Sequence, residues 1–153
     1  MTSVDEIRNF RQVTPALATS GQPSEPQLAA IAQSGYDVIV NLALHDDPRY
    51  SLADEAASVA SLGIEYVHIP VKFDAPTESD LDQFIAVMKR IEHRRVWIHC
   101  ASNLRVPTFL GLYWNLQLGW PVDRAFALME SLWQPNQIWS QFISAQLAKP
   151  RAA

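Results

Sequence analysis

Residues 95–106 of the chain read RVWIHCASNLRV, and this stretch indicates how the protein folds. Its first half, as far as His99, is rich in β-branched and apolar side chains, which is typical of a short buried strand. Apolar residues then recur from Phe109 to Leu116 on nearly every side of a helix, as expected in the middle of a fold. We therefore expect a strand, a turn that contains Cys100, and a central helix that begins near Arg105.

The rest of the chain alternates strand-like and helix-like segments. Further strands are expected at residues 10–13, 17–19, 36–42 and 64–69, and further helices at 24–35, 51–63, 77–91, 122–133 and 136–149. Ser24 (with Gln27 in a capping box), Ser51 and Thr77 are the expected N-caps of the first three helices. Strand–helix repeats with short connections predict an α/β fold with a mostly parallel central sheet flanked by helices. We expect one domain over residues 1–153.

Composition excludes several classes of protein. The net charge of −4 argues against a nucleic-acid partner, and no apolar stretch approaches the roughly 20 residues that span a bilayer. One cysteine excludes an internal disulfide and a multi-cysteine metal site, and His45, His68 and His93 lack ligand spacing. We therefore expect a cytoplasmic protein with no metal or other cofactor and no membrane partner. The oligomeric state cannot be read from the sequence.

Cys100 stands where a buried strand meets the start of a helix. Unpaired backbone N–H groups point outward at such a helix end, and the N–H groups of residues 101–105 can form an anion-binding nest. This set comprises Ala101, Ser102, Asn103, Leu104 and Arg105. A thiolate is the anion that such a nest prefers, and the planar guanidinium of Arg105 suits two oxygens of a phosphoryl group. The alternative is a buried, inert cysteine beside a solvated arginine.

The segment HCASNLRV at 99–106 resembles the signature of the cysteine-dependent phosphatases. The likeness extends to SGQP at 20–23, VNLAL at 40–44 and HIPVKFDAPT at 68–77, and is strongest to the small bacterial dual-specificity and tyrosine-phosphatase-like branch. It implies the cysteine-phosphatase fold, a phosphorylated substrate and a phosphocysteine formed on Cys100.

The same resemblance assigns roles to further residues. Arg105 and the loop amides would hold the phosphoryl oxygens, and His99 would anchor the loop backbone and help set the pKa of the thiol. The family places its general acid on the loop that contains Asp74, and Asp46 and Asp47 are weaker candidates for that role.

Two features of the loop keep other functions open. Four residues separate Cys100 from Arg105 where the phosphatases have five, and Val106 replaces the Ser or Thr that assists breakdown of the phosphoenzyme. A six-residue loop is also typical of rhodanese-like sulfurtransferases, so Cys100 could instead carry a persulfide. A third reading is an oxyanion-binding module without turnover. Asn103 stands where such loops often have glycine, and asparagine tolerates a positive φ.

Overall fold

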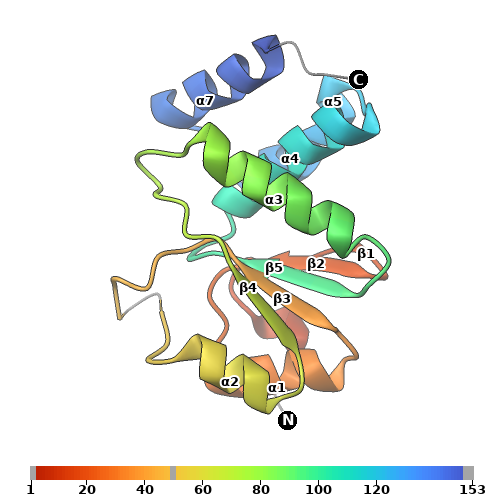
Figure 1. The fold of residues 1–153 in the computed structure, drawn as a ribbon, viewed down its shortest axis with the longest axis vertical. Coiled ribbons are helices and arrows are strands. Elements are labelled where there is room, and N and C mark those ends of the chain that lie inside the picture. Colours follow the sequence, from red (N-terminus) through yellow and green to blue (C-terminus); the bar gives the residue numbers. More distant parts are fainter. Residues whose placement is uncertain (1–2, 49–50, 150–153) are drawn as a thin grey trace.

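A five-stranded sheet forms the centre of the computed structural model, which describes residues 3–48 and 51–149 (Figure 1). Its strands are β1 (Arg11–Thr14), β2 (Leu17–Ser20), β3 (Val38–Asn41), β4 (Glu65–His68) and β5 (Val96–His99), in the order β1-β2-β5-β3-β4. The edge strand β1 is antiparallel to β2, and all other pairs are parallel. The predicted α/β fold with a mostly parallel sheet is confirmed.

Helices cover both faces of this sheet. The 3-10 helix η1 (Val4–Glu6), α1 (Glu25–Gln33) and α2 (Glu55–Ser61) lie on one face, while α3 (Glu78–Arg90), α4 (Arg105–Leu118), α5 (Val122–Ala125), α6 (Ala127–Glu130) and α7 (Gln137–Ala148) lie on the other (Figure 1). No helix among the described residues is both long enough and apolar enough to cross a membrane.

The central strand β5 belongs to both cores. Trp97 packs in the apolar cluster under α1 and α2, whereas Val96 and Ile98 belong to the cluster under α3 and α4, because side chains alternate along a strand. By the same alternation His99 faces the α2 side. Helix α4 is buried at every residue from Arg105 to Trp114, so the predicted central helix is confirmed.

Two of the three predicted helix starts are confirmed in detail. The hydroxyl of Ser24 accepts from the amide of Gln27, whose side chain accepts from the amide of Ser24. Thr77 caps α3 in the same way, and its partner in the capping box is Asp80.

The predicted start of the second helix at Ser51 is wrong. Helix α2 begins at Glu55, and its N-cap is Asp54, whose carboxylate accepts from the amide of Ala57. The hydroxyl of Ser51 donates to the carbonyl of Asp47 instead, so it does not cap a helix. A carboxylate three residues later therefore takes the capping position.

The predicted helix over residues 122–133 is also wrong, because the structure divides it into α5 and α6. The break lies at Phe126, which has φ −102° and ψ 9°. Its buried ring packs against Gly111 of α4, where an added Cβ would lie 2.5 Å from a ring carbon. Packing of this ring against α4 accompanies the break in the helix.

Candidate active site

On one side, the backbone of the loop between β5 and α4 is hydrogen-bonded to the end of β2 and the turn that follows it. The amide of Cys100 donates to the carbonyl of Ser20 at 3.3 Å, and the amide of Gln22 donates to the carbonyl of Ala101 at 3.0 Å. The carbonyl of Cys100 faces Nδ1 of His99. A trans peptide points its N–H away from its carbonyl, so the amides of Ala101 and Ser102 point away from this scaffold. The arrangement supports the expected anion-binding loop.

Asn103 shapes the second half of the loop. It adopts a left-handed conformation with φ 61°, as expected from the sequence, and it is fully buried. Its side-chain Nδ2 donates to the carbonyl of Asn9 and to the hydroxyl of Thr19, each at 2.9 Å. Asn9 returns a bond from its own Nδ2 to the carbonyl of Ser102 at 2.8 Å. The amide side chain thus ties the loop to the N-terminal segment and to β2.

Gly21 permits a close approach between the loop and the turn after β2. Gly21 and Ser102 form an isolated bridge, and a Cβ at position 21 would lie 2.6 Å from the carbonyl oxygen of Ala101. No ordinary side chain tolerates that separation from a backbone atom, so the turn requires glycine here.

Cys100 and Arg105 line the same cavity, which measures about 200 Å³. The other lining residues are Phe73, Ala101, Ser102 and Leu104. Cys100 is almost completely buried, and Arg105 is 7% exposed. The Nη1 of Arg105 donates to the carbonyl of Val71 at 2.7 Å, and its guanidinium lies 5.8 Å from the ring centre of Phe73.

A second cavity of about 300 Å³ shares Phe73, Ala101 and Arg105 with the first. Its remaining lining residues are Ala43, Leu44, Asp46, Asp47 and Asp74. These residues come from the loops after β3, β4 and β5, at the carboxyl ends of the parallel strands, where open α/β sheets bind their ligands. Asp74 is exposed at this cavity, and both weaker acid candidates lie there too.

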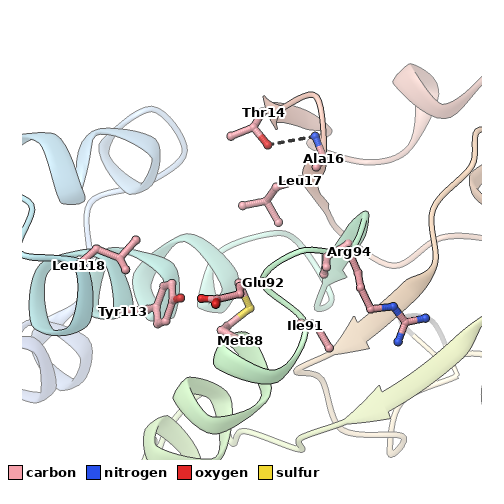
Figure 2. Close-up of a pocket in the computed structure, with 10 residues that line it drawn as sticks. Thr14, Ala16, Leu17, Met88, Ile91, Glu92, Arg94, Tyr113 and Leu118 are labelled. Atoms are coloured by element: carbon pink, nitrogen blue, oxygen red, sulfur yellow. Dashed lines mark hydrogen bonds between the residues drawn. The ribbon is translucent and has the colours of Figure 1, made fainter.

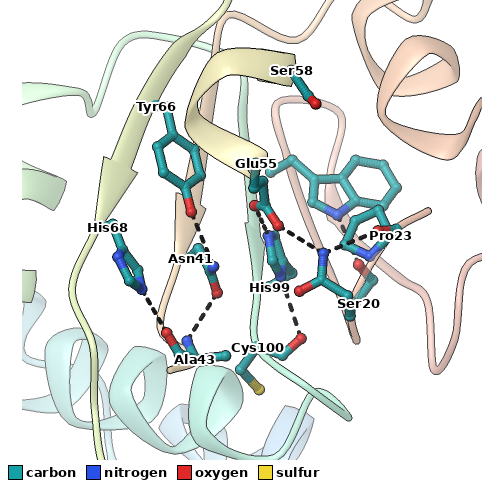
Figure 3. A network of polar contacts seen from close by, with 12 residues as sticks. Ser20, Pro23, Asn41, Ala43, Glu55, Ser58, Tyr66, His68, His99 and Cys100 are labelled. Atoms are coloured by element: carbon teal, nitrogen blue, oxygen red, sulfur yellow. Dashed lines mark hydrogen bonds and ion pairs between the residues drawn. The ribbon is translucent and has the colours of Figure 1, made fainter. Parts of the chain in front are cut away.

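Behind the loop, His99 belongs to a polar network that was not predicted from the sequence (Figure 3). Its Nε2 lies 2.6 Å from a carboxylate oxygen of Glu55, and both side chains are fully buried. The other carboxylate oxygen accepts from Nε2 of Gln22 at 2.7 Å. Glu55 gave no signal in the sequence, because an acidic residue in the first turn of a helix is ordinary.

The network continues between β3 and β4. Nδ2 of Asn41 donates to the hydroxyl of Tyr66 at 3.0 Å, and Nε2 of His45 lies 3.2 Å from the same oxygen. His68 donates from Nε2 to the carbonyl of Ala43 at 2.6 Å. Burial raises the pKa of Tyr66 far above its ordinary value and lowers the pKa of His68. Within residues 3–48 and 51–149, no group of three or more His, Cys, Asp or Glu is arranged to hold a metal ion.

A third pocket, of about 230 Å³, lies at the opposite end of the sheet (Figure 2). Its walls include Leu17 and Val96, which begin β2 and β5, together with Glu92, Arg94 and Tyr113. Because Cys100 follows the other end of β5, this pocket is separate from the loop.

Solved structures with similar folds are phosphatases or phosphatase-like proteins. A DUF442 protein from Shewanella putrefaciens CN-32 is 29% identical, with 95% of each chain covered and a TM-score of 0.83. TpbA from P. aeruginosa, solved in complex with pTyr, is 17% identical over 85% of this chain and 75% of its own, with a TM-score of 0.65. The core catalytic domain of the PP-IP phosphatase SIW14 from S. cerevisiae is also 17% identical, over 90% of this chain and 85% of its own, with a TM-score of 0.71. The likeness to the last two concerns the fold alone.

No curated protein matches the chain, but the model of a known protein family does. Residues 2–114, which carry the whole sheet and the Cys100 loop, match the family model PTP-NADK, described as a DSP-PTPase phosphatase fused to NAD+ kinase. The chain therefore belongs to this family of DSP-PTPase phosphatases, which are protein tyrosine and dual-specificity phosphatase-like hydrolases.

Proposed function

We propose that the protein hydrolyses a phosphomonoester through a phosphocysteine on Cys100, with Arg105 as the oxyanion clamp and Asp74 as the general acid. The observation that carries this proposal is the single cavity that Cys100 and Arg105 line together with Ala101, Ser102 and Leu104 of the loop between them. A nucleophile, backbone amides and a bidentate cation within one cavity are the groups that phosphoryl transfer to a thiolate requires.

In the first step the Cys100 thiolate attacks phosphorus, an S–P bond forms, and the P–O bond to the leaving group breaks. A proton from Asp74 neutralises the departing oxygen. In the second step water attacks phosphorus, the S–P bond breaks, and inorganic phosphate leaves with the thiolate restored. Asp74 accepts a proton from that water and thus returns to its acid form.

The surroundings of Arg105 support its role as a clamp. Its Nε is buried and has no hydrogen-bond partner among the described residues. A buried N–H without an acceptor costs about 1–3 kcal/mol. A phosphoryl oxygen bound beside Cys100 would accept from this group, whereas Nη1 is already bound to the carbonyl of Val71.

The placement of Asp74 supports its role as the acid. Its cavity adjoins the Cys100 cavity, and the two share Phe73 and Arg105, so a substrate whose phosphate lies at Cys100 would extend towards Asp74. Asp46 and Asp47 line the same cavity and are the alternatives if the variant at position 74 stays active.

Two substrate classes are to be tested first, because relatives of the same fold are known with them: TpbA was solved with pTyr, and SIW14 is a PP-IP phosphatase. Phe73 borders both cavities and is partly exposed, so an aromatic surface stands beside the phosphate position. We propose an aryl phosphate as the better substrate of the two, since aromatic rings stack favourably.

A paired assay tests the reaction. Release of nitrophenol from p-nitrophenyl phosphate should depend on Cys100 and should be lost in Cys100→Ser, while transfer of sulfur from thiosulfate to cyanide should stay at background. Asp74→Asn should lower turnover on phenyl phosphate by about 10²–10⁴-fold but far less on p-nitrophenyl phosphate, whose leaving group departs without a proton. Sulfur transfer that requires Cys100, without release of phosphate, would instead support the sulfurtransferase. Binding of phosphate without either reaction would identify an oxyanion-binding module.

A further inference from the structure

Glu55 is a buried charged residue for which the proposed reaction has no use. It is the first residue of α2, and its side chain is fully buried. Removing a carboxylate from water is costly unless charged or hydrogen-bonding partners compensate. Such a residue therefore needs an explanation in terms of what it binds.

Both oxygens of the Glu55 carboxylate are bound. Oε2 lies 2.6 Å from Nε2 of His99, and Oε1 accepts from Nε2 of Gln22 at 2.7 Å (Figure 3). Burial by itself raises the pKa of Glu55, but the hydrogen bonds of His99 and Gln22 and the positive charges of His99 and His45 together outweigh it, so the pKa lies below its ordinary value. Glu55 is therefore an ionised acceptor.

His99 faces an acceptor at each of its ring nitrogens. Nε2 faces the carboxylate of Glu55, and Nδ1 lies 3.3 Å from the carbonyl oxygen of Cys100, which cannot donate. A neutral imidazole carries one N–H, so it can satisfy one of these oxygens but not both. The doubly protonated ring satisfies both.

Other titratable groups also lie near this pair. His68 and Tyr66 approach from β4, and His45 approaches from the loop after β3. The lowered pKa of His68 and the raised pKa of Tyr66 keep both side chains neutral near pH 7. Cys100 is a further titratable neighbour, and in Figure 3 its sulfur points away from Glu55.

We propose that Glu55 is a positioning residue that holds His99 as an imidazolium against the carbonyl of Cys100. The bond fixes that carbonyl on the scaffold side and so directs the amide of Ala101 to the opposite side. The ring also places a positive charge nearer to Cys100 than the negative charge of Glu55, which favours the thiolate. This inference rests on the proposed function for its effect on turnover.

The protonation of His99 can be measured directly. ¹⁵N-histidine NMR of the whole chain should show one imidazolium that persists at pH 8. Single His→Gln variants at positions 45, 68 and 93 assign it by elimination, because the sequence has four histidines. A neutral His99 in the wild-type protein at pH 8 would overturn the proposal, and this measurement requires no variant of Glu55.

Variants of Glu55 test its effect on the thiol. In Glu55→Gln the imidazolium signal should be lost by pH 7, and alkylation of Cys100 by iodoacetamide should be about tenfold slower at pH 6.5. Glu55→Asp keeps the charge and should retain the signal and most of the reactivity. Glu65→Gln is the matched control, since it removes ion pairs with Arg90 and Arg94 far from His99. An unchanged NMR spectrum and alkylation profile in Glu55→Gln would contradict the proposed role.

Neither readout involves phosphate hydrolysis, so the two proposals can fail separately. A wild-type protein with the imidazolium and the expected alkylation profile, but without phosphatase activity that requires Cys100, would refute the proposed function and leave the role of Glu55 intact. An active phosphatase with a neutral His99 would do the reverse.

Discussion

Substitution of Asn103 tests whether its left-handed conformation and its side-chain bonds hold the loop in place. Both Asn103→Ala and Asn103→Gly lose the two hydrogen bonds to Asn9 and Thr19, at about 0.5–1.5 kcal/mol each. Alanine also has to adopt the φ of 61°, which costs about 1–2 kcal/mol. Glycine avoids that strain but costs about 0.4–1 kcal/mol through the entropy of the unfolded chain. We expect the free energy of unfolding to fall by about 2–5 kcal/mol in Asn103→Ala, and by about 0.5–1 kcal/mol less than that in Asn103→Gly.

Urea denaturation of each variant measures these losses. Asn115 is the matched control, because its Nδ2 also donates to a backbone carbonyl, that of Trp120, but it lies inside α4. At position 115 the order should reverse, with alanine more stable than glycine by about 1 kcal/mol. If Asn103→Ala is as stable as Asn103→Gly, the left-handed conformation is refuted. A loss of less than about 0.5 kcal/mol in the free energy of unfolding of either variant would refute the buried hydrogen bonds.

Three further outcomes are expected. Gly21→Ala should lower both the affinity for phosphate and the free energy of unfolding, because its Cβ would lie 2.6 Å from the carbonyl oxygen of Ala101. Gly63→Ala should lower the free energy of unfolding alone, because its Cβ meets no other atom but alanine rarely adopts the φ of 77° found there. Phosphate titration and urea denaturation compare the two variants. If the hydroxyl of Ser102 assists hydrolysis of the phosphoenzyme, Ser102→Ala should make the phosphoenzyme accumulate in rapid-quench experiments, and an unchanged steady-state level would exclude this role. Burial lowers the pKa of His68, so at this residue the unfolded chain binds the proton first as pH falls through about 6.5. The free energy of unfolding of the wild-type protein, measured relative to that of His68→Gln, should therefore fall between pH 7.5 and 5.5.

Features fixed by local chemistry could be predicted from the sequence. The capping boxes at Ser24 and Thr77 satisfy backbone groups within one turn, and asparagine is one of the few residues suited to the conformation of Asn103. The strand, turn and helix around Cys100 likewise follow from a change in apolar periodicity within residues 95–106.

Features that depend on contacts between distant segments could not be predicted. Asp54 and Glu55 are adjacent acids at the start of a helix. Only the packing of α2 on the sheet determines that Asp54 caps the helix while Glu55 points inward to His99. In the same way, the break at Phe126 accompanies a contact with Gly111 on another helix. Neither contact leaves a periodic trace in the sequence.

The short spacing between Cys100 and Arg105 is compatible with a phosphate-sized loop because of the conformation of Asn103. The left-handed Asn103 turns the chain directly into α4, so Arg105 reaches the cavity in its first turn.

The same geometry bears on the missing hydroxyl at position 106. Val106 is fully buried in the core under α4 and does not line the cavity, whereas Ser102 lines it together with Cys100. A hydroxyl that assists breakdown of the phosphoenzyme must reach the water that attacks phosphorus. In this chain we therefore expect the hydroxyl of Ser102, within the loop, to assist breakdown of the phosphoenzyme in place of the Ser or Thr that the family has after the arginine. As a consequence of this exchange, we expect the phosphoenzyme to break down slowly.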